Sequence, residues 1–114
     1  MIPMLLGRTT LEQRPSIVER VRAMIEANSP MGIACAQLGM ADRRDSTYLL
    51  PGINFPVLII VGSEDKLTNV AEAESILNEI PGAHLRVIHV AGHLSNLENP
   101  DKFNRELAEF ISRL

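Results

Sequence analysis

The feature that most constrains the fold is an unbroken apolar run of strand length, "PVLIIV", at residues 56–61. Such a run is typical of a parallel strand that is buried on both faces. An amphipathic helical pattern follows at 69–80, ends at Pro81-Gly82, and leads into a second strand-like run at 84–90. Two strands joined by a helix predict a parallel, right-handed βαβ unit. A final helix, predicted to start at Asn99-Pro100, extends the unit to βαβα.

Helical patterns occupy the region before these strands. At residues 9–28 apolar side chains recur at helical spacing, and Thr9 together with Glu12 predicts a capping box at the start. Pro15 lacks a backbone N–H, so we expect it to divide this stretch into a short first turn and a longer helix.

A second helix is predicted to begin directly after residue 28. Ser29 is a favourable N-cap, and Pro30 suits the first helical position. The helical pattern ends near Gly39, and the polar stretch at 41–52 is predicted to be a loop.

Length, charge and cysteine content exclude several classes of protein. The chain has 114 residues, of which 46% are apolar, enough for one small domain. A net charge of -3 without a basic stripe argues against nucleic-acid binding. No apolar run approaches the roughly 18 residues of a membrane helix, so we expect no membrane partner. The single cysteine, Cys35, cannot form an internal disulfide, which predicts a reducing, cytoplasmic location.

Polar loops follow both predicted strands. The first loop contains Glu64 and Asp65, and the second contains His93. Functional groups of parallel α/β sheets gather at the carboxyl ends of the strands, so these side chains are expected to meet. A carboxylate that accepts the Nδ1–H of a histidine leaves Nε2 free as a general base. The alternatives are a helix-capping role for Asp65, a local backbone contact for His93, and Glu64 as the acid.

The three histidines raise the question of a metal site. His89 and His93 have helical i, i+4 spacing, and His84 lies nearby in the sequence. Their spacing falls across a predicted strand and a turn, where it does not place two rings on one face. We therefore predict no metal site, and we expect His84 and His89 to be ordinary strand residues.

The second half of the chain resembles the C-terminal part of the α/β-hydrolase fold family, in particular its small esterase and enol-lactonase-like members. In that family an acid follows a late strand in a G-x-x-D-x-x-T pattern, which Gly62, Asp65 and Thr68 match. The family's histidine follows the last strand in a G-H turn, which Gly92-His93 matches. The resemblance implies that Asp65 and His93 are the acid and the base of a catalytic triad.

The resemblance also implies an organisation for the whole chain. Residues 1–52 are expected to be the end of a helical cap and the segment that returns to the core. Residues 53–114 are expected to be the C-terminal βαβα segment of the hydrolase core. The predicted fold class is thus α/β, a partial α/β-hydrolase fold with two parallel strands. Glu98 matches a glutamate that the family carries in an E-x-P stretch, and we expect it to order the loop.

The family's nucleophile is a serine in a G-x-S-x-G turn, and none of the seven serines lies in such a pattern. The complete enzyme would hydrolyse a small carboxylic ester, thioester or lactone without a metal or an organic cofactor. The present chain is expected to be inactive or nearly so alone, because loss of such a serine costs on the order of 10⁶ in rate. Whether it is an enzyme by itself is left open here.

Two other functions are compatible with the sequence. A two-stranded parallel sheet leaves strand edges unpaired, which favours a non-catalytic module that self-associates or pairs with a missing N-terminal half. The third possibility is an enzyme that uses only Asp65 and His93, for instance as a general base in a hydration reaction. Activity that is lost in both Asp65→Asn and His93→Ala would favour this third possibility or a residual hydrolase, whereas activity that is indifferent to both would indicate a contaminant.

Overall fold

The computed structural model describes all residues, 1–114, and contains seven α-helices, one 3₁₀ helix and two strands. None of the helices has the length and apolarity needed to span a bilayer. In chain order the elements are α1 (Ile2–Leu5), α2 (Arg8–Gln13), α3 (Pro15–Glu26), α4 (Pro30–Asp42), η1 (Thr47–Gly52), β1 (Leu58–Gly62), α5 (Val70–Glu79), β2 (His84–Ile88), α6 (Ser95–Glu98) and α7 (Pro100–Ser112).

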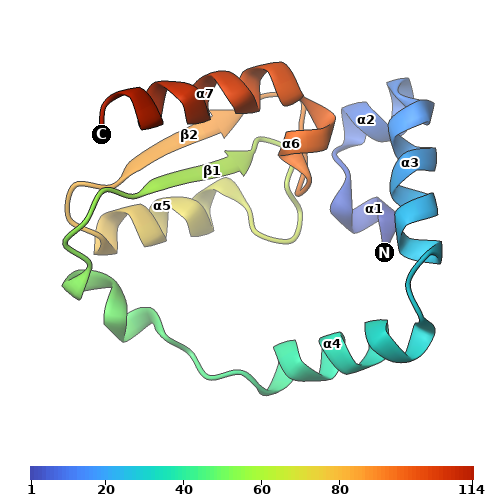
Figure 1. Cartoon of the computed structure of the whole chain (residues 1–114), viewed down its shortest axis with the longest axis horizontal. Helices are drawn as coiled ribbons and strands as arrows, with labels where there is room; N and C mark the ends of the chain where they lie inside the picture. Colours follow the sequence, from blue (N-terminus) through green and yellow to red (C-terminus); the bar gives the residue numbers. More distant parts are fainter.

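The two strands and the helix between them form the predicted parallel βαβ unit. Leu58 pairs with His84 at one end of the ladder, and Gly62 pairs with Ile88 at the other. Helices α5 and α7 contact both strands and lie on opposite sides of the two-stranded sheet (Figure 1). The α/β fold class and the parallel strand direction predicted from the sequence are therefore confirmed.

Strand β1 is less buried than its apolar sequence predicts. Val61 and Gly62 are buried, whereas Leu58, Ile59 and Ile60 are only half-buried. The reason is that β1 has a single neighbouring strand, so one edge of the sheet beside it stays open. The expectation that this strand is covered on both faces is wrong for its first three residues. The apolar core is correspondingly small and consists of Leu6, Val21, Val61, Ala73, Ile80, Ile88 and Ala91.

The N-terminal helices begin differently from the prediction. The chain does divide at Pro15, which occupies the first position of α3. Helix α2, however, begins at Arg8 with Gly7 as its N-cap, and no side chain caps it. The capping box expected from Thr9 is wrong. Thr9 instead directs its free N–H and its hydroxyl to Glu64, because α2 packs against the loop after β1.

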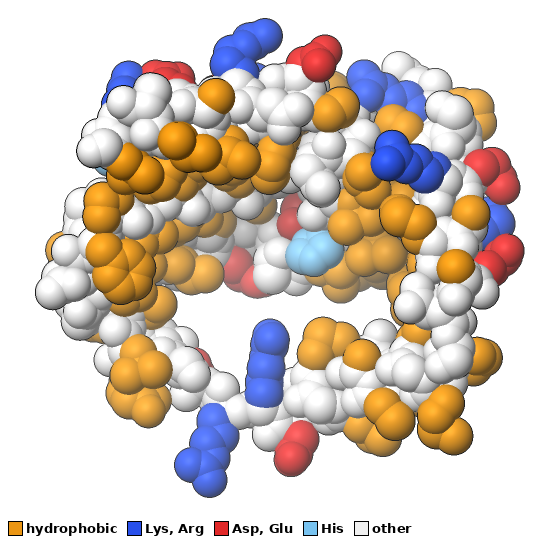
Figure 2. All heavy atoms as spheres, in the orientation of Figure 1, with side chains coloured by type: hydrophobic (Ala, Val, Ile, Leu, Met, Phe, Trp, Pro, Cys, Tyr) orange, Lys and Arg blue, Asp and Glu red, His pale blue; other side chains and the backbone are white.

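Helix α4 begins as predicted, with the Ser29 hydroxyl accepting the Gly32 N–H at 2.9 Å. It continues past Gly39 to Asp42, and the 3₁₀ helix η1 forms in the stretch predicted as a loop. Helix α4 buries none of its residues and lies in an arc that extends away from the sheet (Figure 1). Apolar side chains are visible along this helix (Figure 2), and the apolar residues of its sequence, PMGIACAQLGMAD, are not confined to one helical face. Such a distribution is typical of a helix that is covered on all sides.

The C-terminal helix α7 begins at Pro100, as expected. Asn99 precedes it without capping it, and the Asn99 side chain donates instead to the His89 carbonyl at 3.2 Å. The short helix α6, which the sequence did not predict, connects the histidine turn to α7. The loop after β2 is thereby tied to the start of α7.

Candidate functional site

The carboxyl ends of β1 and β2 bring the predicted acid and the predicted base together. Asp65 lies in the loop after β1, and His93 lies in the turn after β2. The distance between His93 Nδ1 and Asp65 Oδ2 is 3.0 Å, a normal hydrogen bond between residues 28 positions apart. Parallel pairing produces this meeting, because it places the ends of both strands at the same edge of the sheet.

Asp65 is held in one orientation by its own loop. Its Oδ1 accepts the backbone N–H groups of Leu67 at 2.9 Å and Thr68 at 3.0 Å. The Thr68 hydroxyl lies 3.2 Å from Oδ2. Burial by itself would raise the pKa of Asp65, but the bonds from Thr68, His93 and Leu67 outweigh it and hold this pKa below its usual range. Asp65 is therefore an ionised acceptor at neutral pH.

The ionised carboxylate determines which nitrogen of His93 carries the proton. Nδ1 is the ring atom that bonds to Asp65, and it also lies 3.3 Å from the Thr68 hydroxyl. An acceptor-only carboxylate requires Nδ1 to be the donor, which leaves the lone pair of Nε2 free. Such a ring can accept a proton at Nε2 while the aspartate stabilises the imidazolium that results.

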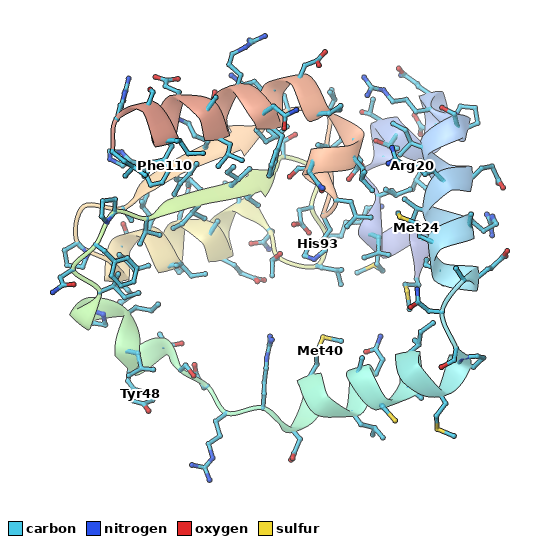
Figure 3. All side chains as sticks on the ribbon, in the orientation of Figure 1. Arg20, Met24, Met40, Tyr48, His93 and Phe110 are labelled. Carbon is cyan, nitrogen blue, oxygen red and sulfur yellow. The ribbon has the colours of Figure 1, made fainter.

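His93 is accessible from solvent, in contrast to its partner. The side chain of His93 is 37% exposed, whereas that of Asp65 is 4% exposed. Figure 2 shows an open gap between α4 and the part of the molecule that contains the sheet. His93 points toward this gap, and Met40 of α4 faces it from the other side (Figure 3). The open side of the ring is thus available to a reacting group.

The glycines of both sequence patterns are required by close backbone contacts. A Cβ on Gly62 would collide with the carbonyl oxygens of Ala91 and Gly92. A Cβ on Gly92 would collide with the backbone nitrogen of Gly7. Three segments therefore approach one another more closely at this edge than side chains would allow.

The turn that carries His93 contains one strained residue. Val90 has φ of 53°, in the left-handed region that a β-branched residue rarely adopts. Such a conformation costs about 1–3 kcal/mol and persists only where the surrounding structure enforces it. Here it reverses the chain after β2, so that the buried Ala91 and Gly92 lead directly to His93.

Glu64, the competing acid, is bound elsewhere. Its Oε1 accepts the Thr9 N–H at 2.7 Å, and its Oε2 accepts the Thr9 hydroxyl at 2.6 Å. Burial would raise the pKa of Glu64, but the two bonds from Thr9 and the charges of Arg8 and Lys66 lower it overall. The structure therefore places Asp65, and not Glu64, against the histidine.

The N-terminal segment contributes contacts that the sequence reasoning missed. The Leu5 carbonyl accepts the backbone N–H groups of His93 at 2.9 Å and Leu94 at 3.3 Å. Glu98 binds Gly7 as well as the histidine turn, which agrees with its expected role in ordering the loop. Backbone bonds between residues so far apart carry no signal in the sequence.

The other histidines lie away from this pair. The backbone N–H of His84 bonds to Val57 at the start of the sheet, and the His89 carbonyl accepts the bond from Asn99. No three His, Cys, Asp or Glu side chains are grouped so that they could hold a metal ion.

Comparison with known proteins shows which proteins the chain is similar to. No family model matches the chain. It is 34% identical over 105 residues to 3-oxoadipate enol-lactonase 2 of Acinetobacter baylyi, covering 90% of this chain and 38% of that protein. A thermophilic esterase from Thermogutta terrifontis superposes with a TM-score of 0.94 at 38% identity, over 99% of this chain and 42% of the esterase. A hydrolase from Pseudomonas aeruginosa gives a TM-score of 0.84 at 33% identity, over 96% and 41%.

The parallel βαβα unit and these similarities show that the chain belongs to the α/β-hydrolase fold family and corresponds to its C-terminal part. Within the family it is similar to esterases and lactonases. The chain spans about two fifths of the length of the relatives it matches.

Proposed function

We propose that this chain is the part of an α/β-hydrolase that supplies the acid and the general base of the triad, Asp65 and His93. The observation that supports this most directly is the 3.0 Å bond from His93 Nδ1 to a buried, ionised Asp65, with Nε2 left open. The proposed substrate of the complete enzyme is a small carboxylic ester, thioester or lactone, and the similarity to an enol-lactonase and to an esterase supports the ester and the lactone.

The proposed chemistry of the complete enzyme follows from this orientation. Nε2 of His93 removes the proton of a serine hydroxyl, and the serine oxygen attacks the carbonyl carbon of the substrate. The imidazolium then donates that proton to the leaving oxygen or sulfur as the acyl bond breaks. Water then gives a proton to the same Nε2 and attacks the acyl carbon, and the imidazolium returns that proton to the serine oxygen as the acid is released. Asp65 stays ionised throughout, and no metal or organic cofactor is required.

The serine would come from outside these 114 residues, since no G-x-S-x-G pattern occurs among them. A chain without it is therefore proposed to be inactive or nearly so alone. General-base assistance by itself is worth about 10²–10⁴-fold, and only for a substrate that is held near the base. The division into a cap-derived part, residues 1–52, and a core part, 53–114, belongs to the same proposal. The exposed, unpaired Cys35 supports a cytoplasmic location.

A chimaera provides the direct test. The region of the Thermogutta terrifontis esterase that this chain matches is replaced by the present chain, a graft that the TM-score of 0.94 supports. We expect hydrolysis of p-nitrophenyl acetate by the chimaera and a rate near that of free imidazole for the chain alone. His93→Ala abolishes the activity of the chimaera. His89→Ala is the matched control, because His89 is exposed and lies outside the site. A folded chimaera whose activity does not depend on His93 contradicts the proposal.

The second candidate is an assembly module, and the exposure of apolar surface favours it. Leu38 and Met31 of α4 are 71% and 74% exposed, and β1 has an unpaired edge. Exposed apolar surface of this kind marks an interaction site, for a second copy or for a missing N-terminal half. Sedimentation of the chain, with Leu38→Lys beside the equally exposed Leu114→Lys, tests self-association. A monomer at all concentrations contradicts the homo-oligomer.

A further inference from the structure

Glu98 is the most enclosed charged side chain near the site. It is fully buried, and its carboxylate accepts three backbone N–H groups. Oε1 binds Gly7 at 2.7 Å, and Oε2 binds Gly92 at 2.9 Å and Leu94 at 3.2 Å. A buried carboxylate is costly unless hydrogen bonds of this kind compensate the loss of water, so each of the three donors matters.

The three donors surround His93. Gly92 and Leu94 are its two neighbours in the chain, and Gly7 belongs to the N-terminal segment that crosses the turn. The same segment accepts the His93 N–H through the Leu5 carbonyl. The Arg14 guanidinium in turn donates to the Glu98 carbonyl. The backbone on both sides of His93 is thus bound to the Glu98 carboxylate and to the N-terminal segment that contains Leu5 and Gly7.

We propose that Glu98 is a positioning residue that sets the imidazole of His93 against Asp65. The direction of the ring depends on the backbone dihedrals of His93, which the bonds at Gly92 and Leu94 restrict. A shift of about 0.5 Å is enough to impair a catalytic arrangement, so this restriction bears directly on the base. The inference rests on the proposed function for its catalytic meaning, but it describes a property of the chain that is measurable without substrate.

Glutamine is the informative substitution at this position. Glu98→Gln keeps the shape of the side chain but replaces one acceptor oxygen with an NH₂ group, which cannot accept a backbone N–H. Depending on the orientation of the amide, either Gly92 and Leu94 or Gly7 loses its acceptor. Glu106→Gln is the matched control. Glu106 is likewise a buried glutamate, but it binds Arg86 and Lys102 on the face of the sheet beneath α7.

Nuclear magnetic resonance on the whole chain reads out the effect. In the unchanged chain we expect the ¹⁵N shifts of His93 to report a single tautomer with the proton on Nδ1. In Glu98→Gln we expect a mixture of tautomers, and amide exchange that is at least about tenfold faster at the donors that lose their acceptor, either Gly92 and Leu94 or Gly7. In Glu106→Gln we expect the tautomer and all three exchange rates to be unchanged.

The outcomes separate this inference from the proposed function. An unchanged tautomer in Glu98→Gln, or the same mixture in Glu106→Gln, overturns it. If Glu98→Gln does not fold, as judged by circular dichroism, Glu98→Asp carries the same test, because it retains the charge but withdraws both oxygens by one methylene. Suppose that Glu98→Gln shows a mixture of tautomers and that the chimaera with the unchanged sequence folds but is inactive. This combination supports the positioning role of Glu98 and contradicts the hydrolase proposal.

Discussion

The histidine turn and helix α4 differ in how far their polar and apolar groups find partners within this chain. At the turn, buried carboxylates accept backbone N–H groups and three glycines allow close backbone contact. In α4 an apolar helix buries none of its residues. The Asp65–His93 pair is thus held by contacts within this chain, whereas α4 leaves its apolar residues exposed.

The largest expected effect breaks the pair itself. In the esterase chimaera, Asp65→Asn keeps the shape of the side chain but removes the ionised acceptor, so His93 no longer keeps its proton on Nδ1. We expect kcat to fall by about 10⁴-fold while the fold is retained. Steady-state hydrolysis of p-nitrophenyl acetate, beside circular dichroism of the same sample, measures both. A loss of less than tenfold would show that Asp65 does not orient the base.

The next prediction concerns the close backbone contacts of the histidine turn. Gly92→Ala places a methyl group against the Gly7 nitrogen and forces the N-terminal segment away from the turn. We expect the free energy of unfolding to fall by about 1–3 kcal/mol, as for other overpacked sites. Urea unfolding followed by circular dichroism measures the change. A neutral result would mean that the segment packs more loosely than the contact requires.

The lowered pKa of Asp65 predicts a pH dependence of stability. A carboxylate whose folded pKa lies below its unfolded value contributes stability that is fully present above the unfolded pKa, about 3.9. That contribution disappears as the pH falls through the folded pKa, which the bonds from Thr68 and His93 lower. Comparing urea unfolding at about pH 6 and pH 3, we expect the advantage of the unchanged chain over Asp65→Asn to shrink at the lower pH. Asp42→Asn, at an exposed position of α4, serves as the control and should show no such change.

The smallest expected effect concerns helix α4. A Cβ on Gly39 of α4 meets nothing within 4 Å, so Gly39→Ala fits without strain. Alanine favours a helix over glycine by about 0.5–1 kcal/mol. Because α4 buries none of its residues, we expect slower amide exchange within α4 and an unchanged urea midpoint for the rest of the chain. If the urea midpoint rises together with the exchange protection, α4 and the core unfold together.

Several elements could be predicted because their signals are local. Pro15 divides the first helical stretch, and Ser29 caps α4. Each of these effects acts within a few residues, where spacing in the sequence equals proximity in space. Thr9 failed as a capping residue for the converse reason, since its hydroxyl found a stronger, ionised acceptor 55 positions away.

The parallel strand pair and the two polar loops that follow the strands could be predicted from the sequence, because strand length, helical periodicity and turn residues act locally. Which carboxylate faces His93, how far β1 is buried, and that Gly7 is bound to Glu98 became clear only from the packed chain. That last bond joins residues 91 positions apart. Such choices depend on which distant groups compete for the same donors and on how many neighbouring strands are present, and neither is expressed in the spacing of residues along the chain.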